Sequence, residues 1–132
     1  MLPLDGVQKA LYDALTAALA PVPVLDYGHN QAFPYVSIGE MIAGQDDALK
    51  EQSVNIECTV HVWSRQRGML EMSSLMAAAK DALDRKVLPA VGFQWVTTIW
   101  MYGQTMRDAD GVTRHGILRF RVMTFTQIST TN

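Results

Sequence analysis

Alternation of apolar and polar residues gives the clearest strand signal, over residues 52–63. From residue 54 on, every even position is apolar and the odd positions are mostly polar. Strict alternation over this length, in β-branched residues, is typical of a strand with one face on a core. The even positions are Val54, Ile56, Cys58, Val60 and Val62, and the odd positions are Asn55, Glu57, Thr59, His61 and Trp63.

Two other segments repeat their apolar residues every three or four positions, which predicts amphipathic helices. The first covers residues 5–20, where Asp5 and Gln8 resemble a capping box, and nearby prolines forbid its continuation. The second covers residues 67–85 and precedes another proline. Its apolar stripe consists of Met69, Met72, Met76, Ala79 and Leu83.

Further strands follow from the same rules. Residues 34–40 predict a short strand, and residues 41–51 after it form a connection that is long for a hairpin. That connection is either a solvated surface loop or an arm that orders on meeting a partner. Residues 93–102 predict a strand with large apolar residues on both faces. Residues 116–126 alternate cleanly, and Asp110-Gly111 predicts a hairpin turn before them.

The predicted fold class is therefore α+β, in a single domain over residues 1–132. The expected order is helix, strand, strand, helix, strand, strand. The sheet should be small and mostly antiparallel, with about four strands, and both helices should pack on one face. A chain of this length can bury a self-sufficient core. Cys58 belongs to that core, and residues 127–132 are polar and should fray.

The sheet face away from the helices is the candidate contact surface. Aromatic residues mixed with arginine are typical of protein–protein contacts. The alternative is that other segments of the chain cover this face. The candidate interface residues are Trp63, Trp100, Arg119, Arg121, Met123 and Phe125. The candidate contact residues of the long loop are Gln45, Asp46, Asp47 and Lys50.

The sequence contains no pattern that predicts catalysis, a cofactor or a metal site. The three histidines are not spaced as metal ligands, although a fold can bring distant ones together. Asp108 and Asp110 resemble part of a calcium loop, but Met106 and Ile117 stand where two of its ligands would be. A single cysteine excludes a disulfide framework. The net charge of −2 argues against a basic field for nucleic acid, and no apolar run is long enough to predict a membrane partner.

Four stretches resemble the tail-completion (tail-terminator) family of long-tailed phages and gene transfer agents. They are residues 7–19, residues 34–39, residues 60–65 running into a helix after Gly68, and residues 110–120. The strongest are the Val-Trp-Ser-Arg strand end and the Asp-Gly…His-Gly turn into the last strand. The sparse polar content of residues 95–102 departs from the pattern. The resemblance implies a virion protein without enzymatic activity or cofactor.

The resemblance further implies a ring, commonly a hexamer, on the last tier of the tail tube. Such a ring stops addition of tube protein and joins a head–tail connector protein, and DNA passes transiently and without specificity through its lumen. A net acidic chain suits this role because a basic lumen would hold DNA. Residues 41–51 could reach a neighbour or the tube. The subunit would assemble in the cytoplasm of a bacterial host and end in the tail or neck of the virion.

Two other classes stay open. One is a different head–tail connector, such as a neck or head-closure protein, which would bind the portal side instead of the tube. The other is a dimeric α+β ligand-binding domain or small enzyme, which would need a pocket with converging polar groups.

Overall fold

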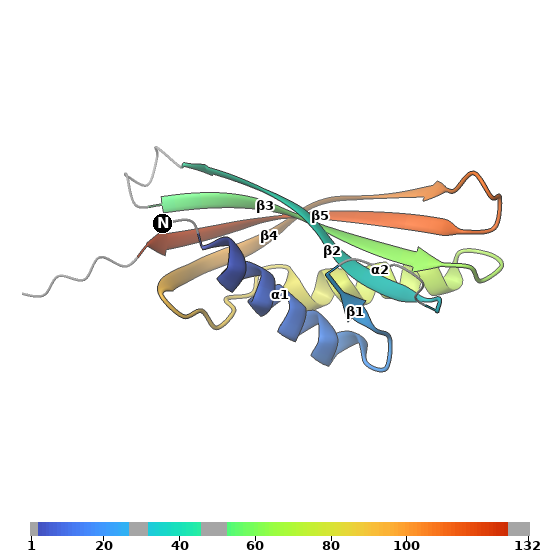
Figure 1. Cartoon of the computed structure of the whole chain (residues 1–132), viewed down its shortest axis with the longest axis horizontal. Coiled ribbons are helices and arrows are strands. Elements are labelled where there is room, and N and C mark those ends of the chain that lie inside the picture. Colours follow the sequence, from blue (N-terminus) through green and yellow to red (C-terminus); the bar gives the residue numbers. More distant parts are fainter. Residues whose placement is uncertain (1–2, 27–31, 46–52, 127–132) are drawn as a thin grey trace, which may run out of the picture.

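A five-stranded sheet with two helices on one face makes up the described chain (Figure 1). The computed structural model describes residues 3–26, 32–45 and 53–126. The strand order is β1-β2-β3-β5-β4, and only the β1–β2 pair is parallel. The α+β prediction is confirmed. The elements are α1 (Leu4–Leu19), β1 (Val24–Leu25), β2 (Tyr35–Gln45), β3 (Ser53–Ser64), α2 (Leu70–Leu83), β4 (Phe93–Arg107) and β5 (Arg114–Thr126).

The strands differ from the prediction in number and length. The two-residue strand β1 is an additional fifth strand at the edge of the sheet. β2 continues to Gln45, so residues 41–45, predicted as the start of a loop, are strand. A register shift between Ile38 and Met41 interrupts the alternation there, and this bulge hid the continuation. The other candidate loop residues, Asp46, Asp47 and Lys50, lie outside the described residues, as do residues 127–132.

The start of α1 also differs from the prediction. The helix begins at Leu4, with Pro3 as its N-cap and no side-chain cap hydrogen bond. Asp5 lies in the first turn, where the helix dipole favours a carboxylate. The Gln8 amide does not turn back to the backbone but donates to the Asp26 carboxylate. The predicted capping box is therefore wrong.

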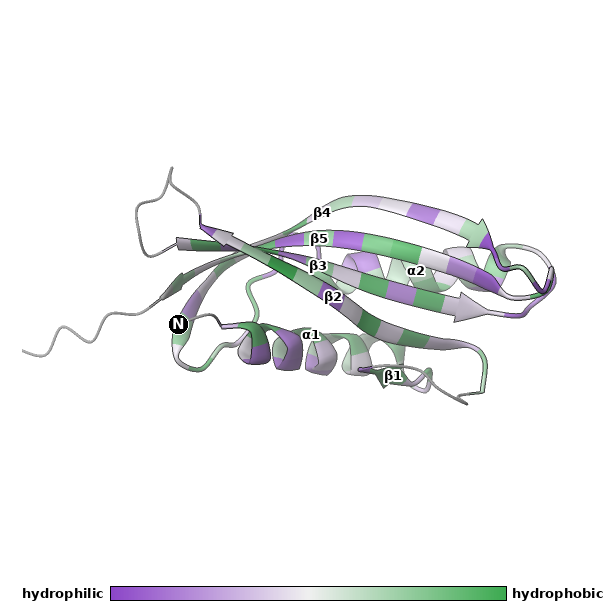
Figure 2. Cartoon of the chain, turned by 45° about the horizontal axis from the view of Figure 1, so that its top comes forward, coloured by the Kyte–Doolittle hydropathy of each residue, from purple (hydrophilic) through white to green (hydrophobic). Residues whose placement is uncertain are grey.

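The core lies between the helices and the facing side of the sheet. Hydrophobic and hydrophilic residues alternate along β3 and β5 in Figure 2, so each strand offers one apolar face to the helices. Phe120 is fully buried at the centre, and burial of such a side chain stabilises by about 1.5–3 kcal/mol. The other buried members include Val7, Leu11, Leu15, Ile56, Cys58, Val60, Val62, Met72, Ala79, Leu83, Leu118 and Val122.

β4 turns both of its tryptophans toward the helices. Two register shifts against β5 rotate the strand, which is why its sequence looks apolar on both sides. Trp95 is buried in the core, and Trp100 pairs with Phe120. The Lys80 ammonium of α2 lies 5.0 Å from the centroid of the Trp100 ring, and the Asp84 carboxylate accepts the backbone N–H of Trp100 at 2.8 Å. The prediction that Trp100 lies on the outer face is wrong.

Candidate functional site

The outer face of the sheet, away from the helices, brings together most of the predicted contact residues. β3 and β5 pair without a register shift, so Glu57 opposes Arg121 and Asn55 opposes Met123. Because side chains alternate between the two faces, all odd positions of both strands lie on this outer face. Five of the six predicted interface residues share it: Trp63, Arg119, Arg121, Met123 and Phe125. Gln45 ends β2 and is exposed.

Charged side chains form a loose network at the middle of the outer face. The Arg119 guanidinium lies 3.9 Å from the Glu40 carboxylate and 4.0 Å from the Glu57 carboxylate. The pKa of Glu40 is lowered, first by its own backbone N–H and further by His61 and Arg119. Arg121 is exposed and makes no ion pair within the described residues. The face is therefore nearly neutral, with one free guanidinium.

Three buried polar side-chain atoms of this face lack a hydrogen-bond partner among the described residues. They are Nε of Arg119, Oδ1 of Asn55 and Oγ1 of Thr59. A buried polar atom without a partner costs about 1–3 kcal/mol. Because these atoms are closed off from solvent, the cost falls on the fold of the chain itself.

An aromatic stack occupies one end of the outer face. The Trp63 and His115 rings lie 3.8 Å apart with an interplanar angle of 7°, and the Tyr35 ring lies 6.0 Å from Trp63. The Trp63 indole N–H donates to Oγ of Ser37 at 3.3 Å. Nδ1 of His61 lies 2.7 Å from Nε2 of His115. Trp63 is thus half-buried within its own subunit.

The sequence did not reveal the histidine pair. His61 and His115 are 54 residues apart, and only the register of β3 against β5 makes them neighbours. Their shared odd-position parity is a weak signal, because the predicted last strand begins at residue 116, one position after His115, whereas β5 begins at Arg114. Burial, followed by the nearby His61, lowers the pKa of His115. The half-buried His115 imidazole therefore favours its uncharged form.

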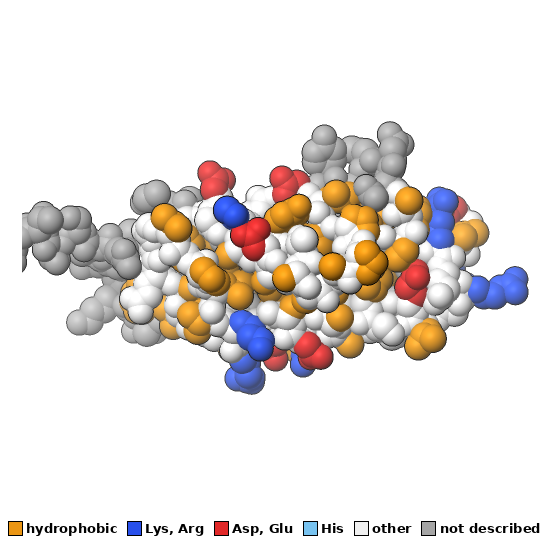
Figure 3. Space-filling model, turned by 90° about the horizontal axis from the view of Figure 1, so that it is seen from below, with side chains coloured by type: hydrophobic (Ala, Val, Ile, Leu, Met, Phe, Trp, Pro, Cys, Tyr) orange, Lys and Arg blue, Asp and Glu red, His pale blue; other side chains and the backbone are white. Residues whose placement is uncertain are grey.

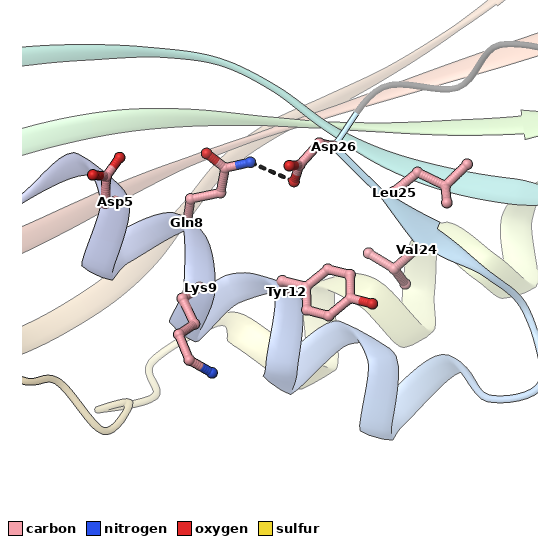
Figure 4. A pocket seen from close by; sticks show the side chains of 7 residues that line it. All are labelled: Asp5, Gln8, Lys9, Tyr12, Val24, Leu25 and Asp26. Atoms are coloured by element: carbon pink, nitrogen blue, oxygen red, sulfur yellow. Dashed lines mark hydrogen bonds between the residues drawn. The ribbon is translucent and has the colours of Figure 1, made fainter.

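A pocket of about 500 Å³ lies on the helix layer, between α1 and β1 (Figure 4). We call it the α1–β1 pocket. The Lys9 ammonium at its rim pairs with Asp13 at 2.8 Å, and Gln8 donates to Asp26. These groups bind one another and form no nucleophile and base set. The lining residues are Asp5, Gln8, Lys9, Tyr12, Val24, Leu25 and Asp26.

Other chemistry is not signalled in the part of the chain that the structure describes. No group of three His, Cys, Asp or Glu side chains within it could hold a metal ion. No helix among those residues is long and apolar enough to cross a membrane. Cys58 is fully buried, as predicted, and burial raises the pKa of its thiol to about 12. It is an inert core thiol.

Comparisons with known proteins agree with one another. A family model described as Tail completion protein gp17 matches residues 8–124. The Tail completion protein gp17 of Bacillus phage SPP1 is 31% identical over 94 residues, covering 71% of this chain and 69% of that protein. The solved structure of bacteriophage SPP1 gp17 matches with a TM-score of 0.53 and 26% identity, covering 99% of each chain. A chain in the virion of a native gene transfer agent particle has a similar fold, with a TM-score of 0.78 and 19% identity, covering 93% of this chain and 97% of that one.

Proposed function

Because the chain belongs to the Tail completion protein gp17 family, whose members are structural virion proteins and not enzymes, we propose that it forms the ring that ends the tail tube. The family resemblance drawn from the sequence is thereby confirmed. In the proposed role, copies of the chain close into a ring, commonly a hexamer, on the last tier of tube protein. The ring stops further addition and receives the head–tail connector protein. DNA passes through its lumen without specific binding, and the assembled ring resides in the virion tail or neck.

The outer face of the sheet supports this proposal as one side of the subunit contact. It combines the exposed Arg121 guanidinium, which has no ion pair among the described residues, with half-buried Met123 and Phe125. Methionine, aromatic residues and arginine are enriched in protein contacts. A ring needs a heterologous contact, in which this face meets a different surface of the next subunit.

The test is the oligomeric state of two matched variants. Arg119→Glu with Arg121→Glu reverses the outer-face charge, and Lys86→Glu reverses an exposed charge after α2. Native mass and negative-stain images should show rings for the wild type and for Lys86→Glu. The outer-face variant should remain a folded monomer by circular dichroism and unfolding midpoint. Rings that persist in this variant would exclude the outer face as the contact.

Tail tubes provide the test of the role itself. Purified tubes should be capped at one end by the wild-type protein, which should then block further addition of tube subunits. A wild-type protein that forms no ring, either alone or on tube ends, would overturn the proposed function.

A further inference from the structure

Two arginines face each other at the end of the β4–β5 hairpin. Arg107 and Arg114 are direct cross-strand partners. Like charges in directly opposite positions destabilise a sheet. Neither guanidinium pairs with a carboxylate among the described residues, and Nε of Arg114 is buried without a partner. The only side-chain partner shown for Arg114 is Sδ of Met69, at 3.5 Å.

Two of the nearby carboxylates are already engaged by side chains, and a third, Asp108 in the same turn, accepts the backbone N–H of Ala109 at 3.1 Å. Glu71 accepts a hydrogen bond from Oγ of Ser64 at 2.6 Å. Asp110 pairs with Arg65 at 3.6 Å and accepts hydrogen bonds from Thr113. Arg107 and Arg114 therefore have no ion pair among the described residues and are available to bind an acidic group of another molecule.

A surface cavity of about 360 Å³ lies beside this pair, lined by Met69, Thr105, Met106, Arg107 and Arg114. Met69 and Met106 are each 40% exposed. Close to the lining residues along the chain, Leu70 is 76% exposed and Val112 is 57% exposed. The β4–β5 turn and the connection from β3 to α2 lie at the same end of the molecule (Figure 1). From below, Lys or Arg side chains project beside hydrophobic ones at that right-hand end (Figure 3).

This composition fits a protein partner better than DNA. Exposed methionine beside arginine is typical of protein contacts, whereas phosphate is bound by cationic and polar groups and has no use for apolar side chains. We define the hairpin end as Met69, Leu70, Met106, Arg107, Val112 and Arg114.

The α1–β1 pocket has the complementary character. The Asp5 carboxylate has no ion-pair or hydrogen-bond partner among the described residues, and Asp26 accepts only the Gln8 amide there. The Lys9 ammonium is neutralised by Asp13. Tyr12, Val24 and Leu25 supply apolar walls, and Figure 4 shows both carboxylates at the rim. The pocket is thus acidic and partly apolar, while the hairpin end is basic and partly apolar.

We propose that the hairpin end of one subunit docks into the α1–β1 pocket of a second copy. Arg107 and Arg114 then lie beside Asp5 and Asp26. This proposal rests on the proposed function and names the second surface of its heterologous contact. Two different surfaces on one chain allow closure into a ring, which an isologous dimer does not. Met106 opposes His115 at the edge of the outer face, so one subunit contact can contain both regions.

A charge swap tests the proposal. The hairpin variant carries Arg107→Glu and Arg114→Glu, and the pocket variant carries Asp5→Arg and Asp26→Arg. Native mass measurements, on the protein alone or on tube ends, should show that each variant assembles poorly. The protein concentration needed for rings to form should rise at least tenfold. The chain with all four changes should regain rings. A 1:1 mixture of the two variants should also regain them when the subunit number is even, because each contact is then complementary.

Several outcomes would overturn the proposal. Rings that form equally well from both variants would exclude this contact and leave the proposed function standing. The same holds for a folded four-change chain that forms no ring. Rings that persist in the hairpin variant but no longer cap tubes would assign the hairpin end to the tube. If Arg114→Glu prevents folding, the charge swap can be made with Arg107→Glu and Asp5→Arg alone, both at exposed positions, and tests the same contact. A wild type without rings on tube ends would instead count against the proposed function.

Discussion

His61 and His115 share a hydrogen bond of 2.7 Å between Nδ1 and Nε2, beside the ring of Trp63. One imidazole must donate and the other accept, so at least one of them accepts through an unprotonated nitrogen. Burial and the adjacent His61 lower the pKa of His115, while Asp108 and Glu40 act in the opposite direction. Glu40 also connects this pair to Arg119, because its carboxylate lies 3.8 Å from Nε2 of His61 and 3.9 Å from the Arg119 guanidinium. The lowered pKa of His115 favours its uncharged form at neutral or higher pH.

We expect the free energy of unfolding to fall as the pH is lowered from 7.5 to 5.5. Native His115 binds a proton less readily than the unfolded chain, whose histidine pKa is near 6.5, so the unfolded state takes up more protons in this window. Urea unfolding at each pH measures the slope. His115→Gln should reduce the slope of the free energy of unfolding against pH. His29→Gln leaves the pair in place, so the part of the slope that comes from His115 should remain. Equal slopes in wild type and His115→Gln would show that the pair does not contribute.

A second prediction concerns Gly116, where β5 approaches α2. A Cβ at this position would lie 2.7 Å from Sδ of Met72 and of Met76. Overpacking of a core costs roughly 1–3 kcal/mol, so Gly116→Ala should lower the free energy of unfolding by about that amount. Gly44→Ala is the matched strand control, because a Cβ there meets nothing within 4 Å. Identical urea midpoints for the two variants would mean that the methionines move aside without cost.

Cys58 gives a third prediction, on reactivity. Burial raises the pKa of its thiol from 9.0 to about 12, so the native protein holds very little thiolate. Alkylation by iodoacetamide at pH 8 should be on the order of a thousandfold slower in the native state than in urea, because the thiolate is the nucleophile. Mass spectrometry of timed samples measures both rates. Rapid native labelling would show that this part of the core opens frequently.

The alternation of residues was enough to predict the fold class. The unbroken odd and even sets of β3 and β5 gave the central pair, the core face and the outer face. Bulges defeated the same reasoning elsewhere, because one extra residue exchanges the two faces. For this reason the alternation predicts the wrong face for Trp100 and does not predict the last five residues of β2 as strand.

The site was predictable only in part, for a different reason. Arg119 and Arg121 could be placed on the outer face by counting along one strand. The His61–His115 pair and the opposed Arg107 and Arg114 depend on the register between strands, which the sequence pattern alone does not fix. The α1–β1 pocket depends on the two-residue strand β1, which is too short to produce a periodic signal.

The last prediction concerns Asp110, which holds the β4–β5 turn. Its Oδ1 accepts the backbone N–H groups of Val112 at 2.8 Å and Thr113 at 2.7 Å. The hydroxyl and N–H of Thr113, followed by the Val112 N–H, lower the pKa of Asp110 to about 2, so this stabilisation is present above the ordinary pKa of 3.8 and is lost as the pH falls toward 2. At neutral pH, Asp110→Ala should speed amide exchange at both positions, and Asp110→Asn, which keeps one acceptor oxygen, should have a smaller effect. Asp81→Ala, on the exposed side of α2, is the control. Exchange followed by NMR measures the effect, and unchanged protection in Asp110→Ala would show that the strand ladder alone holds the turn.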